Sequence, residues 1–142
     1  IPMGLIPALR EIITRPTRPN RRFPMHSVFT TFASSRFVDK EAVVRTLRAV
    51  AQHLKEQHAE IRAIHLFGSF ATGTATPRSD ADVAVEITCG TDAARRERVV
   101  EAARSAFLEA PVPVEVFVLD SERMQEGWGI AGAVAREGVR LA

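Results

Sequence analysis

The chain has 142 residues, of which 46% are hydrophobic and 25% charged, a balance typical of one globular domain with a sizeable core. No apolar run reaches the roughly 20 residues of a membrane-spanning helix, and prolines interrupt the N-terminal IPMGLIPAL segment, which argues against a signal peptide. The single cysteine, Cys89, excludes an internal disulfide and fits a reducing compartment, so we expect a cytoplasmic protein.

The net charge of +2 is unevenly distributed along the chain. Residues 1–38 carry six arginines and one glutamate, a net charge of +5, whereas residues 39–142 carry 13 basic and 16 acidic residues, a net charge of −3. We therefore divide the chain into an N-terminal arm, residues 1–38, and a globular domain, residues 39–142. The acidic balance of this domain, without Tyr and with one Trp, does not favour nucleic-acid binding.

The arm is rich in proline and arginine. Five of the eight prolines lie in the first 24 residues, and the segment repeats Thr-Arg-Pro, so an extended or irregular backbone is expected there. Two interpretations stay open: an extension without a role in the fold, or an arm that packs on a partner or contacts polyanions. The first is favoured because short basic runs are common.

The remaining elements follow in chain order. Asp39 is suited to cap a helix that runs to about His58, and its apolar stripe is Val43, Leu47, Val50 and Leu54. Apolar runs predict strands at residues 61–67, 81–87 and 114–119, with a second helix from Asp92 to about Glu109 between the last two. A short helix, a helix around residues 130–136 and a short strand at 139–141 complete the order. This succession predicts an α+β fold, a small mixed sheet with helices packed mainly on one face.

Two polar motifs interrupt these apolar strands. The strand at residues 61–67 ends in Gly68-Ser69, a polar loop of ten residues is expected from Phe70 to Ser79, and Asp80-Ala81-Asp82 then opens the next strand. Residues at i and i+2 of a strand point to the same side, so Asp80 and Asp82 repel each other unless a cation lies between them. Carboxylates suit Mg²⁺, and a Gly-Ser turn offers N–H groups and a hydroxyl to phosphates. Together the motifs predict a site for a nucleotide and a metal.

These residues resemble the signature of the DNA-polymerase-β-like nucleotidyltransferase superfamily, and the short chain resembles its minimal nucleotidyltransferase (MNT) branch. The stretch LFGSFATGTATPRSDADVAVEI, with Gly73 and Ser79, carries the resemblance, which extends over residues 39–142. It implies the polymerase-β-like fold, with Gly68, Ser69 and Ser79 binding the nucleotide. Relatives often have a basic residue after Gly-Ser, where this chain has Phe70.

The superfamily uses a third carboxylate on a neighbouring strand, and Glu115, within Val114-Glu115-Val116, is the candidate here. An acid in an apolar strand is costly unless it is paired or bound to a metal. Most relatives carry aspartate at this place. The alternative is an exposed acid on the polar face of a half-buried strand, which the alternation of valines also allows.

The resemblance implies an enzyme that uses ATP and two Mg²⁺ ions held by Asp80, Asp82 and Glu115. It would transfer AMP to a hydroxyl, for this branch a tyrosine of a cognate HEPN-domain toxin, so that the chain acts as an antitoxin in a hetero-oligomer. Two alternatives remain: an antitoxin that neutralises its partner by occlusion without catalysis, and a nucleotidyltransferase acting on a small molecule of the antibiotic type. The four histidines form no zinc motif, and no P-loop is present.

Overall fold

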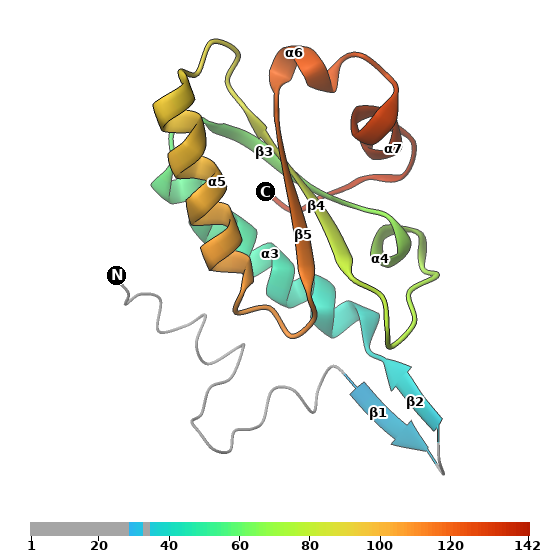
Figure 1. Cartoon of the computed structure of the whole chain (residues 1–142). Coiled ribbons are helices and arrows are strands. Elements are labelled where there is room, and N and C mark those ends of the chain that lie inside the picture. The colour runs from blue at the N-terminus through green and yellow to red at the C-terminus, as the bar shows by residue number, and fades with distance from the viewer. Residues whose placement is uncertain (1–28, 33–34) are drawn as a thin grey trace.

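A computed structural model of the chain describes residues 29–32 and 35–142. The irregular backbone expected for the first 24 residues lies outside this range. At the end of the arm, β1 (Phe29–Phe32) and β2 (Ser35–Val38) form an antiparallel two-stranded sheet that was not predicted (Figure 1).

Four strands form the central sheet in the order β5-β4-β3-β6 (Figure 1). Their bounds are β3 (Ile61–Phe67), β4 (Ala81–Ile87), β5 (Val114–Asp120) and β6 (Val139–Arg140). Strand β3 pairs antiparallel with both β4 and β6, whereas β4 and β5 are parallel. The predicted mixed α+β sheet is therefore confirmed, and β5 lies at one of its edges.

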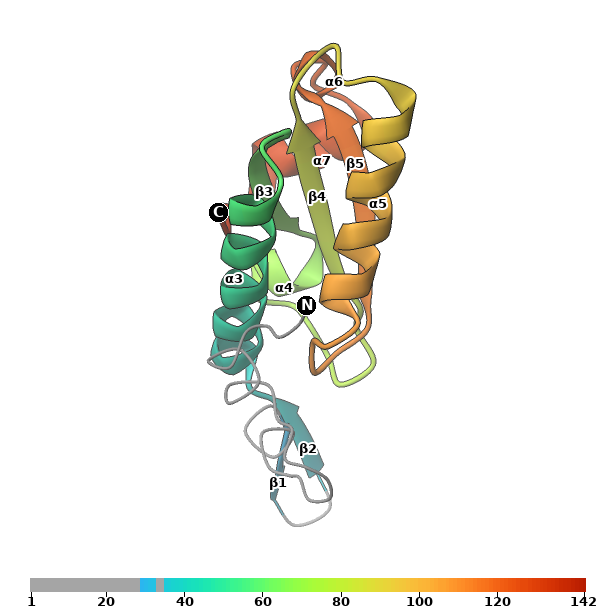
Figure 2. The ribbon, with the colours of Figure 1, turned by 90° about the vertical axis from the view of Figure 1, so that its left-hand side faces the viewer.

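Two long helices, α3 (Lys40–Gln57) and α5 (Ala93–Phe107), lie side by side on one face of the sheet (Figure 2). Both begin where predicted, because the Asp39 carboxylate accepts a hydrogen bond from the N–H of Ala42 at 3.0 Å and Asp92 accepts one from Arg95 at 2.8 Å. Within the described ranges, no helix is both long and apolar enough to cross a bilayer.

The main core lies between these helices and the sheet. Alternate residues of each strand point toward the helices, so Ile64 and Leu66 of β3 and Val83 and Val85 of β4 are fully buried there. Leu47 from α3 is equally inaccessible to solvent. Burial of such side chains stabilises a fold by about 1.5–3 kcal/mol each, so this face supplies most of the stability of the domain.

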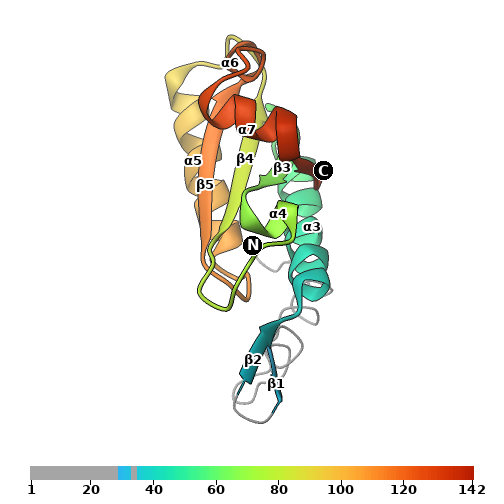
Figure 3. The ribbon, with the colours of Figure 1, turned by 90° about the vertical axis from the view of Figure 1, so that its right-hand side faces the viewer.

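The opposite face of the sheet carries a smaller apolar cluster and shorter helices. Here α6 (Ser121–Met124) is followed by α7 (Gly129–Glu137), which crosses in front of the sheet in Figure 3. The cluster consists of Phe67, Ala84, Leu119 and Val134. The two long helices thus share one face, and the second face remains partly open beside the strand ends.

The segment after β3 departs from the sequence prediction. A polar loop was expected from Phe70 to Ser79, but its start is the short helix α4 (Ser69–Thr72). Phe70 is 5% exposed and belongs to the main core. This burial holds the turn against the sheet, which a pattern of polar residues could not indicate.

Candidate functional site

Gly68 brings the backbone directly against a carboxylate. It follows β3 with φ 78°, a conformation that favours glycine, and a β-carbon at this position would overlap Asp82 Oδ2 and lie 3.2 Å from its Cγ. Position 68 therefore accepts only glycine for two independent reasons. The result is an N–H-bearing turn packed against the Asp-x-Asp motif.

Asp82 lies at the centre of the site. Its neighbours in register are Phe67 on β3 and Glu115 on β5, and it points to the face opposite the main core because Ala81 and Val83 point inward. Glu115 shares that face for the same reason, since Val114 and Val116 pack against the core. The parallel pairing of β4 and β5 thus sets the two carboxylates side by side.

Two further acids, Asp80 and Glu137, lie close enough to Asp82 and Glu115 to affect the pKa of Asp82. Burial raises the pKa of Asp82, and the negative charge and hydrogen bonding of Glu115 raise it further, with smaller contributions from Asp80 and Glu137. Among the ion pairs of the described residues, none involves any of these four carboxylates. The site is therefore a concentration of negative charge that no ion pair in this part of the chain balances.

Glu137 was not identified from the sequence. It is the last residue of α7, and its Oε2 accepts a hydrogen bond from the N–H of Gly68 at 2.9 Å. A helix C-terminus disfavours negative charge, so an acid directly after the predicted helix of residues 130–136 was a signal that another contact stabilises the Glu137 carboxylate. The contact ties the C-terminal helix to the Gly-Ser turn across 69 positions of sequence.

The other predicted residues occupy the connection between β3 and β4. Ser69 is the first residue of α4 and is half-buried. Ser79 accepts a hydrogen bond from the N–H of Thr76 at 2.8 Å, so its hydroxyl closes the loop. Arg78 is exposed. Phe70, which follows Gly68-Ser69, is buried, so this chain uses the position for packing.

The chemistry of the donors fits a hard divalent cation. Mg²⁺ is held by one or two carboxylates together with substrate phosphates, and Asp82 and Glu115 supply adjacent carboxylates with Asp80 beside them. Within residues 29–32 and 35–142, no three side chains of the usual ligand types are arranged to hold a metal as they stand. The protein alone therefore offers a partial coordination shell, which phosphate oxygens would extend.

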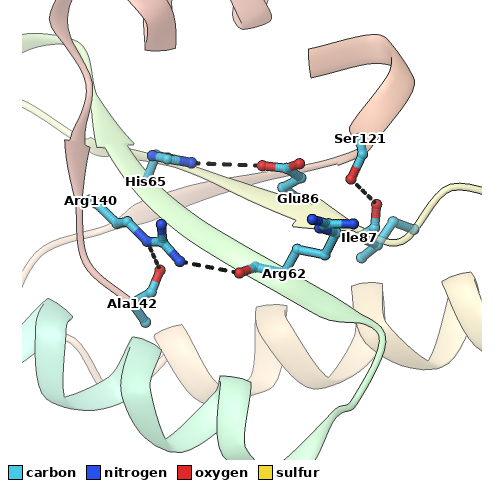
Figure 4. A network of polar contacts seen from close by, with 7 residues as sticks. All are labelled: Arg62, His65, Glu86, Ile87, Ser121, Arg140 and Ala142. Atoms are coloured by element: carbon cyan, nitrogen blue, oxygen red, sulfur yellow. Dashed lines mark hydrogen bonds and ion pairs between the residues drawn. The ribbon is translucent and has the colours of Figure 1, made fainter. Parts of the chain in front are cut away.

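A second polar group on the same face lies farther along the strands (Figure 4). His65 Nε2 lies 3.9 Å from Glu86 Oε1, and Arg140 donates to the carbonyls of Ala142 and Arg62. Burial lowers the pKa of His65, Glu86 partly offsets this effect, and Arg140 lowers the pKa further. Glu86 thus has a histidine neighbour and plays no part in the carboxylate site.

Comparison with known proteins identifies the family to which the chain belongs. The family model described as a nucleotidyltransferase domain matches residues 47–131, more than half of the chain. This range includes Gly68, Asp80, Asp82 and Glu115. Among curated proteins, none matches the sequence significantly.

Several solved structures share an approximate likeness with the chain. A candidate nucleotidyltransferase from Sulfolobus solfataricus is 16% identical, with a TM-score of 0.47 over 71% of this chain and 80% of that one. A mutant of the toxin–antitoxin pair MntA–HpeT is 24% identical, with a TM-score of 0.46 over 68% and 71%. A complex of tri-AMPylated HEPN toxin with MNT antitoxin from Shewanella oneidensis is 18% identical, with a TM-score of 0.39 over 72% and 71%.

Proposed function

Because the chain belongs to the nucleotidyltransferase domain family, we propose that it transfers the AMP group of ATP to a hydroxyl in a reaction that depends on Mg²⁺. The observation that carries this proposal is the pairing of Asp82 with Glu115 directly behind the Gly68 turn. A triphosphate needs N–H donors and a bound cation at one place. Gly68 supplies an N–H group, and the carboxylates of Asp82 and Glu115 beside it would bind the cation.

Gly68 and Ser69 are proposed to bind the β- and γ-phosphates through backbone N–H groups and the Ser69 hydroxyl. In the structure the Gly68 N–H donates to Glu137, so a phosphate oxygen would replace a carboxylate oxygen as its acceptor. Ser79 would act indirectly, because its hydroxyl already stabilises the loop before Asp80. Asp80, Asp82 and Glu115 would hold two Mg²⁺ ions, which supply charge stabilisation to the triphosphate.

The proposed chemistry is an in-line displacement at the α-phosphorus. The acceptor oxygen forms a bond to this phosphorus while the bond to the β-phosphate oxygen breaks, and pyrophosphate leaves with that electron pair. Glu115 is proposed to take the proton of the acceptor hydroxyl, since it is more exposed than Asp82 and lies next to it in register. Asp82, packed behind Gly68, is better placed to orient than to move a proton.

We extend the proposal to the acceptor, a tyrosine hydroxyl on a HEPN-domain toxin that AMPylation would silence, with this chain as the antitoxin. The support is the likeness of residues 66–87 to the MNT signature and the small size of the domain. Within the described residues, one four-stranded sheet with its helices forms the whole domain, so a binding surface on a partner would complete the acceptor site.

The test is transfer of label from α-³²P-ATP to a co-purified partner protein. We expect Asp82→Asn to remove transfer and Glu86→Gln to retain it, because Glu86 is an acid on the same face outside the site. Neutralisation of the partner by the Asp82→Asn protein without any labelling by the parent would instead establish the non-catalytic, occluding antitoxin. Labelling of an aminoglycoside and not of a protein would establish the small-molecule alternative.

A further inference from the structure

Strand β5 presents an unpaired edge next to the carboxylate site. It is the terminal strand of the sheet, and among the described residues its only strand neighbour is β4. The carbonyl of Pro113 accepts a hydrogen bond from the N–H of Ala81 on β4, so the N–H and C=O groups of Val114, Val116 and Val118 point the other way. Arg96 donates to the carbonyl of Val118 at 2.7 Å and covers the far end of this edge.

A groove follows the open part of the same edge. It has a volume of about 700 Å³ and lies between the C-terminal end of α5 and the first half of β5, which are neighbours in Figure 1. Its lining is mostly apolar and includes Phe107, Pro111 and Val116. Leu108 at its rim is 82% exposed, the most exposed large apolar side chain of the described residues.

Two residues of opposite charge, Arg104 and Glu115, line this groove. Glu115 belongs to the carboxylate pair, whereas Arg104 projects from α5 without an ion-pair partner among the described residues. With Arg96 at the far end, the edge is flanked by two cations. When the Mg²⁺ ions of the proposed function neutralise the carboxylates, these two cations would attract an acidic segment along the edge, with its central residue near Glu115.

We propose that this groove binds an extended, acidic peptide segment of the acceptor protein, which adds as a strand to β5 and delivers a hydroxyl to Glu115. The inference rests on the proposed nucleotidyl transfer and specifies how its acceptor is recognised. Main-chain hydrogen bonds to an open sheet edge give affinity without a deep pocket, and alternate side chains of the added strand enter the groove. The exposed Leu108 would cover the apolar side of that strand.

A peptide fits these features better than a nucleic acid or a compact small molecule. A nucleic acid needs several cations along its phosphates, and of the cations in the described part of the chain Arg104 alone lines the groove. A small molecule cannot use the outward-facing N–H and C=O groups of Val114 and Val116 in succession. The spacing of these groups, two residues apart, matches the backbone repeat of an extended chain.

The experiment uses the full chain, Mg²⁺ and α-³²P-ATP with a random Glu-Tyr copolymer as the acceptor. Polyglutamate, which lacks a hydroxyl, and a Lys-Tyr copolymer of opposite charge serve as comparison acceptors. We expect the Glu-Tyr copolymer to be labelled at least tenfold faster than either. Leu108→Asp and Arg104→Glu should each reduce its labelling at least fivefold, whereas Arg98→Glu, on the same helix but outside the groove, should leave it unchanged.

A thermal shift with Mg²⁺-ATP is measured on every variant to separate this proposal from the proposed function. If the shift persists but Leu108→Asp and Arg104→Glu label the copolymer at the parent rate, the groove is not the acceptor site and the proposed function stands. A parent protein that binds Mg²⁺-ATP but labels only an RNA oligonucleotide, or no copolymer, also overturns the peptide proposal. If the parent neither binds Mg²⁺-ATP nor transfers label, the proposed function fails with it.

Discussion

On the face of the sheet beneath α3 and α5, Val83 and Val85 are fully buried, whereas one residue away on the same strand Asp82 faces three other carboxylates. The first face stabilises the fold by removing apolar surface from water. The second weakens it, because like charges close together repel and burial disfavours their charged forms. On this strand, residues that point inward stabilise the fold, and the residues between them that point outward form the carboxylate site. Variants on the two faces should therefore change different measurements.

The largest effect is expected from Glu115→Gln. The neutral amide cannot accept the proton of an acceptor hydroxyl, so transfer should fall by about 10²–10⁴ while Mg²⁺-ATP binding is largely retained. Glu115→Asp, the matched variant, should keep activity because it preserves the carboxylate. Label transfer from α-³²P-ATP measures both. Transfer by Glu115→Gln at the parent rate would reduce Glu115 to a surface acid of β5 and favour the occluding antitoxin.

On the buried face, Leu47→Ala should lower the free energy of unfolding by about 2–5 kcal/mol, because it leaves a cavity in the main core. Urea unfolding measures this loss. The rate of transfer per folded molecule should not change. If this variant lost transfer at full occupancy of the folded state, the separation between the two faces would be incorrect.

These two variants concern features that the sequence indicated. Apolar runs located β3, β4 and β5, and Asp39 and Asp92 located the starts of the long helices. The Gly-Ser and Asp-x-Asp spacing also indicated the turn and carboxylates that meet in the structure. All of these signals are local, because the pattern of apolar residues or a capping residue indicates the structure of the segment in which it lies.

The features that were missed depend on contacts between distant segments. Glu137 reaches Gly68 only because α7 folds back across the sheet, and no spacing in the sequence encodes that return. Helix α4 forms because Phe70 enters the core, and the hairpin of β1 and β2 is too short to show a reliable period. Tertiary packing decides such short elements, so their propensities carry little information.

A smaller effect than core truncation is expected when ligand binds the charged face. A ligand that binds only the native state stabilises it by about 2.7 kcal/mol at 100 times its dissociation constant, so Mg²⁺ and ATP together should raise the melting temperature by several degrees. ATP with EDTA should have much less effect, because the carboxylates around Asp82 then repel the triphosphate. Equal shifts under both conditions would contradict a metal-bridged site.

The smallest effect concerns His65, outside the site. Burial, partly offset by Glu86, lowers its pKa below the ordinary value of 6.5, so the folded state binds this proton less readily than the unfolded state. The contribution of neutral His65 to the free energy of unfolding should be complete above pH 6.5 and should decrease as the pH falls below that value. Melting temperatures at pH 7.5 and 5.5 should differ less for His65→Gln than for the parent. An unchanged pH dependence would show that other groups cause it.

The melting temperature of Asp82→Asn, with and without Mg²⁺-ATP, tests the central claim most directly. The raised pKa of Asp82 means that its charged form destabilises the fold at every pH above the ordinary value of 3.8. At neutral pH and without ligand, Asp82→Asn should therefore melt a few degrees higher than the parent, because the amide removes a half-buried negative charge that Glu115, Asp80 and Glu137 repel. The stabilisation by Mg²⁺-ATP should be lost. A lower melting temperature without ligand, or a shift with Mg²⁺-ATP equal to that of the parent, would contradict the account.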